Sequence, residues 1–348
     1  MAANRDEFYM DRAFELAALG LGHVSPNPLV GCVIVKDGTI VGEGYHMKYG
    51  ESHAEVNAIN SVKDKSLLEG AEIYVTLEPC THYGKTPPCV DLIMKYGFQK
   101  VIIANEDPNP IVAGKGIRKL IDSGYNVVTG VNAEMGKRIN RRFFTNILKK
   151  RPYIILKWAQ TADGYIAREN YESKWISNPY SRMLVHKWRA EEDAIMVGTK
   201  TAAYDNPSLT VREWEGRNPV RIVIDKDRSL DPSLNLFDRR EKTICFNIEL
   251  DKEEENISFI KLNDDENFLL NVFENLLPRN IGSVLVEGGT ALLQSLIKSN
   301  LYDEIRVFKC PVQFSAGIKA PQIPLHDYST DEILKDQLYI YLRKEVGL

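Results

Sequence analysis

One histidine, one glutamate and two cysteines near the start of the chain have the types and spacing of a catalytic zinc site. His53 stands two positions before Glu55 in "ESHAEVNAIN", and Cys80 and Cys89 enclose the loop of "EPCTHYGKTPPC". Zinc binds imidazole and thiolate in a tetrahedron, and a catalytic site leaves the fourth position to water. His53, Cys80 and Cys89 supply three ligands, and Glu55 is left over to carry protons. A disulfide or an ordinary helix start explains only part of this pattern.

Hydrolytic deamination is the chemistry that these residues predict. Zinc lowers the pKa of the water that it binds to about 7. Zinc-dependent nucleobase deaminases carry H-x-E and then P-C-x-x-C, with the glutamate as general acid and base. His53, Glu55, Pro79 and Cys80 match this pattern, but eight residues separate Cys80 from Cys89. The second cysteine therefore departs from the general deaminase spacing.

Helix N-termini must position these residues. Positions i and i+2 do not share a helix face, so His53 and Glu55 can reach one metal only from a first helical turn. We expect this helix over residues 53–62, with Ser52 as its N-cap. A helix start also stabilises thiolate, which suits Cys89. Two helix N-termini should therefore face the metal.

Strands and helices alternate along both halves of the chain, which predicts two layered α/β domains, residues 1–147 and 148–348. Asp37 and Gly38 predict a β-hairpin between the first two strands. Gly97 should end the helix that starts at Cys89. Further helices are predicted over residues 1–20, 115–124, 133–150, 181–192, 266–277 and 290–300, and further strands over 71–77, 100–105, 126–131, 153–159, 194–198, 220–225, 242–248, 283–289 and 304–312.

Length, charge and cysteine count set the class of protein. A chain of 348 residues exceeds the usual size of one core, and its net charge of −4 gives no electrostatic case for nucleic acid. The first residues are amphipathic rather than a signal peptide, and no stretch reaches the roughly 18 apolar residues of a membrane span. An odd number of cysteines argues against a disulfide framework. Cys32 and Cys245 should lie in cores, Cys310 has no clear role, and the acidic run 251–255 should be a solvated edge. We expect a cytoplasmic protein.

Seven segments in a fixed order resemble the bifunctional deaminase/reductase family of riboflavin biosynthesis. "SPNPLVGCVIV", "PCTHYGKTPPC" and "DPNPIVAGKG" are similar to its deaminase half, including the longer loop between the cysteines. "LKWAQTADGYIA", "SKWIS", "DNPSLTVR" and "VEGGTALLQSLI" are similar to its reductase half. The resemblance covers nearly the whole chain. It implies a cytidine-deaminase-like three-layer α/β/α domain followed by a dihydrofolate-reductase-like α/β domain.

The resemblance also implies the reactions and the residues that serve them. The first domain would use one Zn²⁺ to deaminate a diamino-pyrimidinone that carries a phosphoribosylamino group, and the second would use NADPH to reduce ribosyl to ribityl. Deaminase substrate contacts would come from Asn27, His46, His82 and Lys85. Reductase substrate contacts would come from Ser173, Arg189, Leu209, Arg212 and Glu287, and NADPH contacts from Ala159, Trp175, Thr201, Asp205, Gly288, Gly289 and Thr290. Lys157, Asp205 and Glu287 are the ionisable candidates near hydride transfer.

The glycine pair and the arginines also carry a prediction of their own. Gly288 and Gly289 stand between a strand and a helix, where backbone amides bind phosphate well. No G-x-G-x-x-G is present, so no Rossmann domain is predicted. Arg189 and Arg212 suit bidentate binding of phosphate.

Two alternatives remain open. The chain could be a nucleoside or nucleic-acid deaminase whose second domain only binds, or a zinc-stabilised scaffold without activity. The loop between the cysteines and the net charge weigh against the first alternative, and Glu55, which zinc does not need, weighs against the second. We expect a phosphorylated pyrimidine as the partner, no nucleic acid or membrane, and a homo-oligomer.

Overall fold

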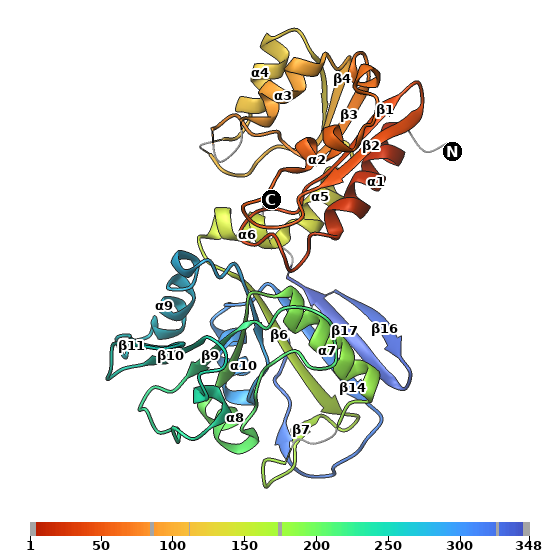
Figure 1. The fold of residues 1–348 in the computed structure, drawn as a ribbon. Coiled ribbons are helices and arrows are strands. Elements are labelled where there is room, and N and C mark those ends of the chain that lie inside the picture. The colour runs from red at the N-terminus through yellow and green to blue at the C-terminus, as the bar shows by residue number, and fades with distance from the viewer. Residues whose placement is uncertain (1–4, 84–86, 111, 173–175, 325–326, 344–348) are drawn as a thin grey trace. The chain divides into compact units, whose positions relative to one another are not determined.

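The computed structural model describes residues 5–83, 87–110, 112–172, 176–324 and 327–343. It divides into two compact units, residues 1–150 and 151–348 (Figure 1). The boundary of 147/148 that we expected from the sequence falls inside the last helix of the first unit, α6 (Arg141–Lys149). Each unit is described by itself below.

A five-stranded sheet is the centre of the first unit in the described residues, with the order β2-β1-β3-β4-β5. β1 is antiparallel to β2 and to β3, whereas β3, β4 and β5 are parallel. Asp37 and Gly38 connect β1 to β2 with φ of 48° and 80°, as a tight hairpin turn requires. The strands are β1 (Gly31–Lys36), β2 (Thr39–Tyr45), β3 (Glu72–Leu77), β4 (Lys100–Asn105) and β5 (Asn126–Thr129).

Helices cover both faces of this sheet. Tyr9, Met10 and Phe14 of α1 (Arg5–Ala18) pack on one face. The opposite face is covered by α2 (Ala54–Ser61), α3 (Cys89–Tyr96) and α4 (Lys115–Asp122). The predicted three-layer α/β/α architecture is confirmed.

The predicted helix over residues 133–150 is wrong as a single element. It is divided into α5 (Ala133–Ile139) and α6 at Asn140, whose φ and ψ are −95° and 18°. The Asn140 side chain is buried, accepts from the Leu29 N–H at 2.7 Å and donates to the Leu29 carbonyl at 2.8 Å. This long-range contact replaces helix continuity, and local helical periodicity contains no sign of it.

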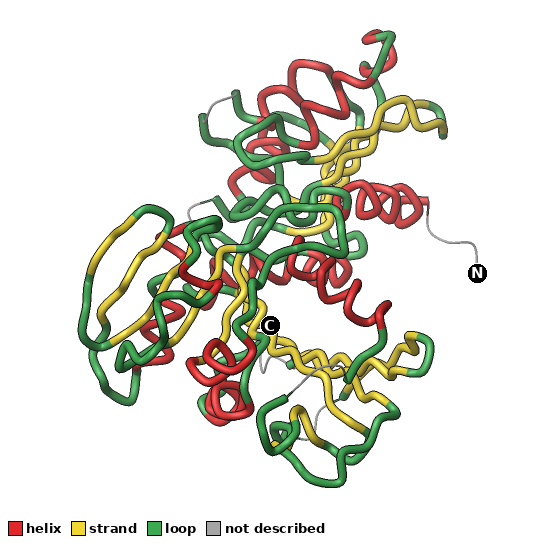
Figure 2. Tube along the Cα trace, turned by 60° about the horizontal axis from the view of Figure 1, so that its bottom comes forward, coloured by secondary structure: helices red, strands yellow, loops and turns green. Residues whose placement is uncertain are grey.

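The second unit is built on a ten-stranded sheet in the described residues, with the order β11-β12-β10-β9-β8-β13-β6-β14-β17-β16. The strands from β12 to β14 run parallel, and β11, β17 and β16 are antiparallel at the two edges. Figure 2 shows the strands of each unit in yellow with red helices beside them. The strands are β6 (Tyr153–Thr161), β8 (Ala194–Gly198), β9 (Val220–Ile224), β10 (Thr243–Asn247), β11 (Lys252–Glu254), β12 (Ile257–Lys261), β13 (Ser283–Val286), β14 (Glu304–Cys310), β16 (Tyr328–Ile333) and β17 (Asp336–Leu342).

Helices also cover both faces of the second sheet. α7 (Pro179–Glu191) and α8 (Thr199–Asp205) pack on one face, and α9 (Phe268–Glu274) and α10 (Thr290–Lys298) on the other. A small separate sheet pairs β7 (Tyr165–Ala167) with β15 (Ile318–Lys319). This α/β unit agrees with the predicted fold class.

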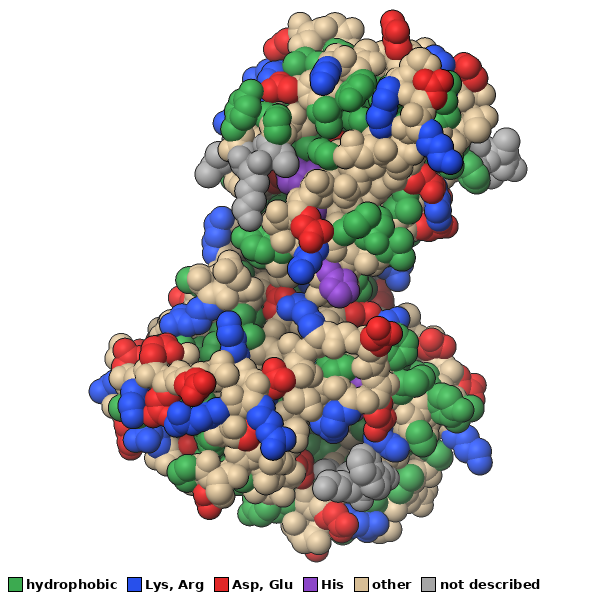
Figure 3. Space-filling model, in the orientation of Figure 1, with side chains coloured by type: hydrophobic (Ala, Val, Ile, Leu, Met, Phe, Trp, Pro, Cys, Tyr) green, Lys and Arg blue, Asp and Glu red, His purple; other side chains and the backbone are tan. Residues whose placement is uncertain are grey.

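Several sequence expectations concern the edges and cores. The acidic run forms the outermost strand β11, and Cys32 and Cys245 are buried as expected. All five cysteines lie in the described residues and are free. No helix in the described part of the chain is long and apolar enough to cross a membrane. Acidic and basic side chains are interspersed on the face of each unit that Figure 3 shows.

Candidate functional site

The three predicted zinc ligands meet at one point in the first unit. The ligand atoms of His53, Cys80 and Cys89 all lie within 4.8 Å of one another. His53 Nδ1 lies 3.6 Å from the Cys80 sulfur and 3.4 Å from the Cys89 sulfur. One nitrogen and two sulfurs on a common centre fit the donor set that zinc prefers, with a fourth position left for water.

Two helix starts and the end of a strand position these ligands. His53 is the N-cap of α2 with φ of −71° and ψ of 165°, and Cys89 is the first residue of α3. The prediction that Ser52 caps this helix is wrong, because the helix begins one residue later. Cys80 follows β3 and is held by α3, since Cys89 N–H donates to its sulfur at 3.4 Å and Val90 N–H to its carbonyl at 3.2 Å.

The two thiols share their protonation unequally. A hydrogen bond from the Cys89 side chain, with a smaller contribution from His53, lowers the pKa of Cys80 to about 4. The pKa of Cys89 is raised, chiefly by that same hydrogen bond and by burial. The pKa of His53 is raised because its ring hydrogen-bonds Cys80. Zinc would bind both sulfurs as thiolates and the imidazole as a neutral ring, so metal binding would release these protons.

Glu55 lies in the first turn of α2, beside the ligands. Its side chain is 3% exposed, and burial together with the charge of Cys80 raises its pKa to about 7. The charge of His53 acts in the opposite direction, but its effect on the pKa of Glu55 is smaller. A carboxyl group with a pKa near neutrality can both accept and return a proton.

Asn27 and His46 form a hydrogen-bonded pair next to the ligand His53. His46 Nδ1 lies 3.1 Å from the Ser52 carbonyl oxygen, which can only accept, so the proton is on Nδ1. The other ring nitrogen of neutral His46 therefore accepts from Asn27 Nδ2 at 3.1 Å. Burial lowers the pKa of His46, which favours this neutral form. Both ring nitrogens are thus engaged, and the His46 ring packs edge-on against His53 at 5.7 Å between centroids.

The two remaining deaminase predictions lie in the loop between the cysteines. His82 is exposed, and its charge acts on the carboxyl group of Asp107. Lys85 lies outside the described residues.

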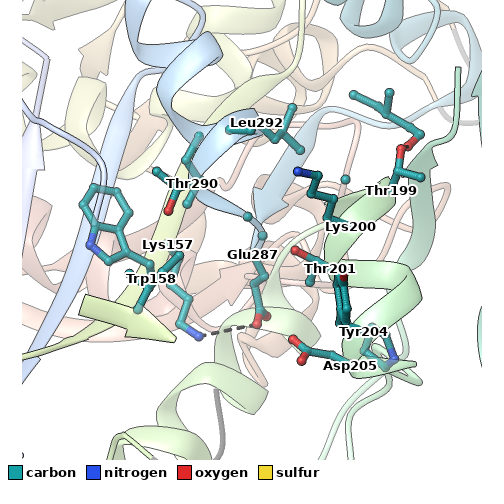
Figure 4. Close-up of a pocket in the computed structure, with 18 of the residues that line it drawn as sticks. Lys157, Trp158, Thr199, Lys200, Thr201, Tyr204, Asp205, Glu287, Thr290 and Leu292 are labelled. Carbon is teal, nitrogen blue, oxygen red and sulfur yellow. Dashed lines mark hydrogen bonds and ion pairs between the residues drawn. The ribbon is translucent and has the colours of Figure 1, made fainter. Parts of the chain in front are cut away.

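A cavity of about 1610 Å³ in the second unit brings together the described reductase residues that the sequence predicted (Figure 4). Figure 4 shows Lys157 and Glu287 pointing toward each other, with Thr201 and Asp205 of α8 beside them. Ser173 and Trp175 lie outside the described residues. The predicted residues that line the cavity are Lys157, Ala159, Arg189, Thr201, Asp205, Leu209, Arg212, Glu287, Gly288, Gly289 and Thr290.

A buried ion cluster lies at the wall of this cavity. The Glu287 carboxylate pairs with Arg189 at 2.7 and 2.9 Å and with Lys157 at 3.4 Å. Burial opposes ionisation of Glu287, but Arg189 and then Lys157 lower its pKa to about 2. Burial lowers the pKa of Lys157. The edge of Arg189 that we expected to face a phosphate is therefore occupied by Glu287.

The glycine pair forms a narrow cradle between β13 and α10. Gly289 has φ of 68°, a conformation that favours glycine. A Cβ on Gly288 or on Gly289 would lie 3.1 Å from the Thr201 hydroxyl oxygen. Backbone without side chains at a helix start fits a dinucleotide phosphate.

Several residues of the cavity wall were not predicted from the sequence, and three of them, His186, Tyr171 and Tyr204, make specific contacts there. His186 stands three positions before Arg189 on α7, a helical spacing that could have identified it. Its Nδ1 accepts from the Arg212 N–H at 3.2 Å, and burial, with the charges of Arg189 and Arg212, lowers its pKa to about 4. Tyr171 and Tyr204 stack with their ring centroids 4.2 Å apart, and only the tertiary structure brings them together.

Comparison with known proteins agrees with both units. Residues 3–105 match the family model described as the cytidine and deoxycytidylate deaminase zinc-binding region, and residues 152–320 match the RibD C-terminal domain. The riboflavin biosynthesis protein RibD of Aquifex aeolicus is 40% identical over 337 residues, covering 95% of this chain and 93% of that protein. Its Escherichia coli counterpart is 37% identical over 88% of each chain.

Solved structures extend this similarity to three dimensions. The diaminohydroxyphosphoribosylaminopyrimidine deaminase/5-amino-6-(5-phosphoribosylamino)uracil reductase of Thermotoga maritima has a TM-score of 0.89 and 38% identity, covering 97% of this chain and 98% of that one. RibD of Acinetobacter baumannii has a TM-score of 0.88 and 30% identity, covering 98% and 99%. The chain belongs to the RibD family of bifunctional riboflavin biosynthesis enzymes, with a zinc-dependent deaminase and an NADPH-dependent reductase in one polypeptide.

Proposed function

We propose that the first unit hydrolyses the pyrimidine amino group of 2,5-diamino-6-(5-phosphoribosylamino)pyrimidin-4(3H)-one, and that the second unit reduces the ribosyl group of the product. The final product would be 5-amino-6-(5-phosphoribitylamino)uracil. The observation that carries the proposal is the convergence of His53, Cys80 and Cys89 beside the buried carboxyl group of Glu55. The reductase half is supported by the Lys157–Glu287 pair in the cavity wall.

In the deaminase, Glu55 moves the protons. Zinc held by His53, Cys80 and Cys89 would supply the Lewis acid that activates water. Glu55 takes a proton from that water and delivers it to the departing amino group, which leaves as ammonia. Asn27 presents its amide to the edge of the pyrimidine ring.

His46 accepts a hydrogen bond from the side-chain amide of Asn27 and so fixes the orientation of that amide. His82 and Lys85, in the loop between the cysteines, would contact the ring or the phosphate of the substrate. The hydrogen bonds of His46 support its assignment, and the place of His82 and Lys85 in the sequence between two metal ligands supports theirs.

In the reductase, the cavity residues bind and orient both reactants. NADPH supplies the hydride. Gly288, Gly289 and Thr290 hold its phosphates, and Ala159, Trp175, Thr201 and Asp205 complete its site. Ser173, Leu209 and Arg212 contact the substrate, with Arg189 and Glu287 beside them.

Lys157 Nζ lies 3.4 Å from Glu287 and can deliver the proton that accompanies the hydride. Burial lowers the pKa of Lys157, which makes its ammonium a better acid. Reduction of the ribosyl group needs one hydride and one proton, so NADPH and Lys157 together balance the reaction.

Supplying each substrate in turn tests the proposal. Zinc-loaded protein should release ammonia from the diamino-pyrimidinone, and should oxidise NADPH only when the deaminated compound is present. Cytidine and a tRNA stem-loop serve as alternative substrates. Failure to release ammonia from the diamino-pyrimidinone would exclude the deaminase assignment, whereas activity on cytidine or tRNA would favour a nucleoside or nucleic-acid deaminase.

A Glu55→Gln variant separates an enzyme from a zinc-stabilised scaffold. It should lose at least about 100-fold in ammonia release, because it cannot accept the proton. Zinc should stay near one ion per chain, because Glu55 is not a ligand. The exposed neighbour Glu51, changed to Gln, is the matched control. A Glu55→Gln protein with full activity would show that another group carries the proton.

We also propose a cytoplasmic homo-oligomer. Two thiol ligands that must stay reduced suit a reducing compartment. β16 is an outermost strand with Tyr328 56% exposed beside Tyr339 and Tyr341, and an edge strand can pair with a second copy. Light scattering should therefore give a mass above that of one chain, and a charged residue in place of Tyr328 should reduce it.

A further inference from the structure

Glu78 is a buried carboxylate close to the candidate metal centre that neither reaction uses. It follows β3 and stands two residues before Cys80, and its side chain is 5% exposed. Burying a charge is costly unless other groups hydrogen-bond it. The partners of Glu78 therefore indicate what it does.

Four backbone N–H groups from one segment converge on this carboxylate. One oxygen accepts from Asp107 at 3.1 Å and Gly114 at 2.9 Å, and the other from Gly116 at 2.7 Å and Ile117 at 3.2 Å. Gly116 and Ile117 belong to the first turn of α4, whose N–H groups lack partners within the helix. Glu78 thus takes the place of a capping residue, and its charge lies at the positive end of the helix.

α4 approaches the chain around Cys80 so closely that a side chain does not fit. A Cβ on Gly116 would lie 2.3 Å from the carbonyl oxygen of Pro79, the residue directly before Cys80. On its other side, Cys80 is held by the N–H groups of Cys89 and Val90. Cys80 is therefore fixed between α3 and α4.

One residue bound by Glu78, Asp107, also senses the charge of His82 from the loop that joins the two cysteines. Asp107 is the first residue of the segment and donates its N–H to Glu78. The pKa of its carboxyl group is raised by burial and by the charge of Glu78, while His82 acts in the opposite direction. His82 belongs to the loop between the cysteines, so Asp107 lies within the electrostatic reach of one residue of that loop.

We propose that Glu78 is a positioning residue of the deaminase, which fixes Cys80 relative to Asp107 and to residues 114–117 through four backbone hydrogen bonds. Cys80 and the start of α4 then keep the same relative position during turnover. The effect on ammonia release rests on the proposed deaminase function, but the effect on the metal site does not.

A Glu78→Gln variant tests the proposal while keeping the shape of the side chain. The amide of glutamine has one oxygen that accepts hydrogen bonds and one NH₂ group that donates them. Two of the four backbone N–H groups would therefore face the NH₂ group and lose their acceptor. Glu72→Gln is the matched control, because Glu72 is a buried carboxylate at the far end of the same strand, paired with Arg5 at 2.8 Å. Both variants should lose stability, but only Glu78→Gln should disturb the metal site.

Three measurements distinguish positioning from plain stability. Cobalt(II)-loaded Glu78→Gln protein should show shifted visible bands, and its zinc should pass to a chromophoric chelator about 10-fold faster or more. The kcat for ammonia release should fall about 10- to 100-fold with a smaller change in KM. Glu72→Gln should leave all three unchanged, and NADPH oxidation with the deaminated substrate should be normal in both variants.

Gly116→Ala disturbs the packing of α4 against Pro79 without changing Glu78. It is the second test of the proposal if the Glu78→Gln protein does not fold. Its Cβ should push α4 away from Pro79 and give the same cobalt shift and faster zinc release. A folded variant of either kind with the parent cobalt spectrum and zinc-release rate would overturn the proposal. If the parent protein released no ammonia, the proposed function would fail, and the cobalt and chelator measurements would still decide the role of Glu78.

Discussion

At the scale of single residues, the direction of hydrogen bonds separates residues that touch substrate from residues that act through a neighbour. His46 has the chemistry of a substrate contact, yet both of its ring nitrogens are engaged, one by Ser52 and one by Asn27. We therefore predict that its contribution to catalysis passes through Asn27.

A double-mutant cycle checks this dependence. Asn27→Ala and His46→Ala should each lower kcat/KM for ammonia release by about 10- to 100-fold. The double variant should be little worse than Asn27→Ala, because residues that act as one unit are not additive. Zinc content is the control and should not change. Additive losses would mean that His46 contacts the substrate itself.

His186 makes the stability of the second unit depend on pH. Its ordinary pKa is 6.5, and in the folded protein it falls to about 4 through burial and the charges of Arg189 and Arg212. Above pH 6.5 the ring is neutral in both the folded and the unfolded chain. As the pH falls from 6.5 to 4, only the unfolded chain takes up the proton, so stability is lost across this window, by at most about 3 kcal/mol.

Tryptophan fluorescence during urea unfolding measures this loss selectively, since Trp158, Trp175, Trp188 and Trp214 all belong to the second unit. A His186→Asn variant keeps an acceptor for the Arg212 N–H but does not titrate. Its unfolding free energy should therefore depend less on pH between 4 and 6.5. An equal pH dependence in both proteins would assign the effect to other groups.

At the scale of elements, hydrophobic periodicity predicted most helices and strands, and long-range contacts explain the misses. The hairpin at Asp37–Gly38 and the helix end at Gly97 carry their signals in the local sequence. Asn140 carries none, because its partner Leu29 is 111 residues away. β16 also escaped prediction, since it is exposed along nearly its whole length and lacks an apolar face.

An Asn140→Ala variant tests how much the hydrogen bonds between Asn140 and Leu29 contribute to stability and to substrate binding. It leaves the N–H and carbonyl of Leu29 without their partner, which should cost about 1–3 kcal/mol of stability in the first unit. Leu29 follows Asn27 in the same loop, so the KM of the deaminase should rise several-fold. Calorimetry and ammonia release measure the two effects. A variant that unfolds earlier with an unchanged KM would limit Asn140 to a role in stability.

At the scale of the whole molecule, each of the two candidate sites draws its described residues from one unit. The residues that meet at the candidate metal centre all belong to residues 1–150, and those of the reductase cavity all belong to residues 151–348. Spacing along the sequence identified the first set. The second set is scattered over six segments of the sequence, and the family resemblance selected most of it. The structure brings its described members together in one cavity.

Metal removal should therefore separate the two activities. Chelation of zinc should abolish ammonia release and leave NADPH oxidation with the deaminated substrate within about two-fold of the untreated protein. Zinc added back should restore ammonia release. Loss of both activities on chelation would show that the reductase depends on the metal of the other unit.

The stacked pair of Tyr171 and Tyr204 connects a strained backbone position to the wall of the reductase cavity. Tyr171 has φ of 67°, a left-handed conformation that costs an ordinary residue roughly 1–2 kcal/mol. Parallel stacking on Tyr204 returns about 0.5–1.5 kcal/mol, so the two contributions nearly cancel. Tyr204 lines the reductase cavity, and any flat ring that takes the face of Tyr204 competes directly with Tyr171. Backbone strain at Tyr171 is thus offset by a ring contact made at the wall of the reductase cavity.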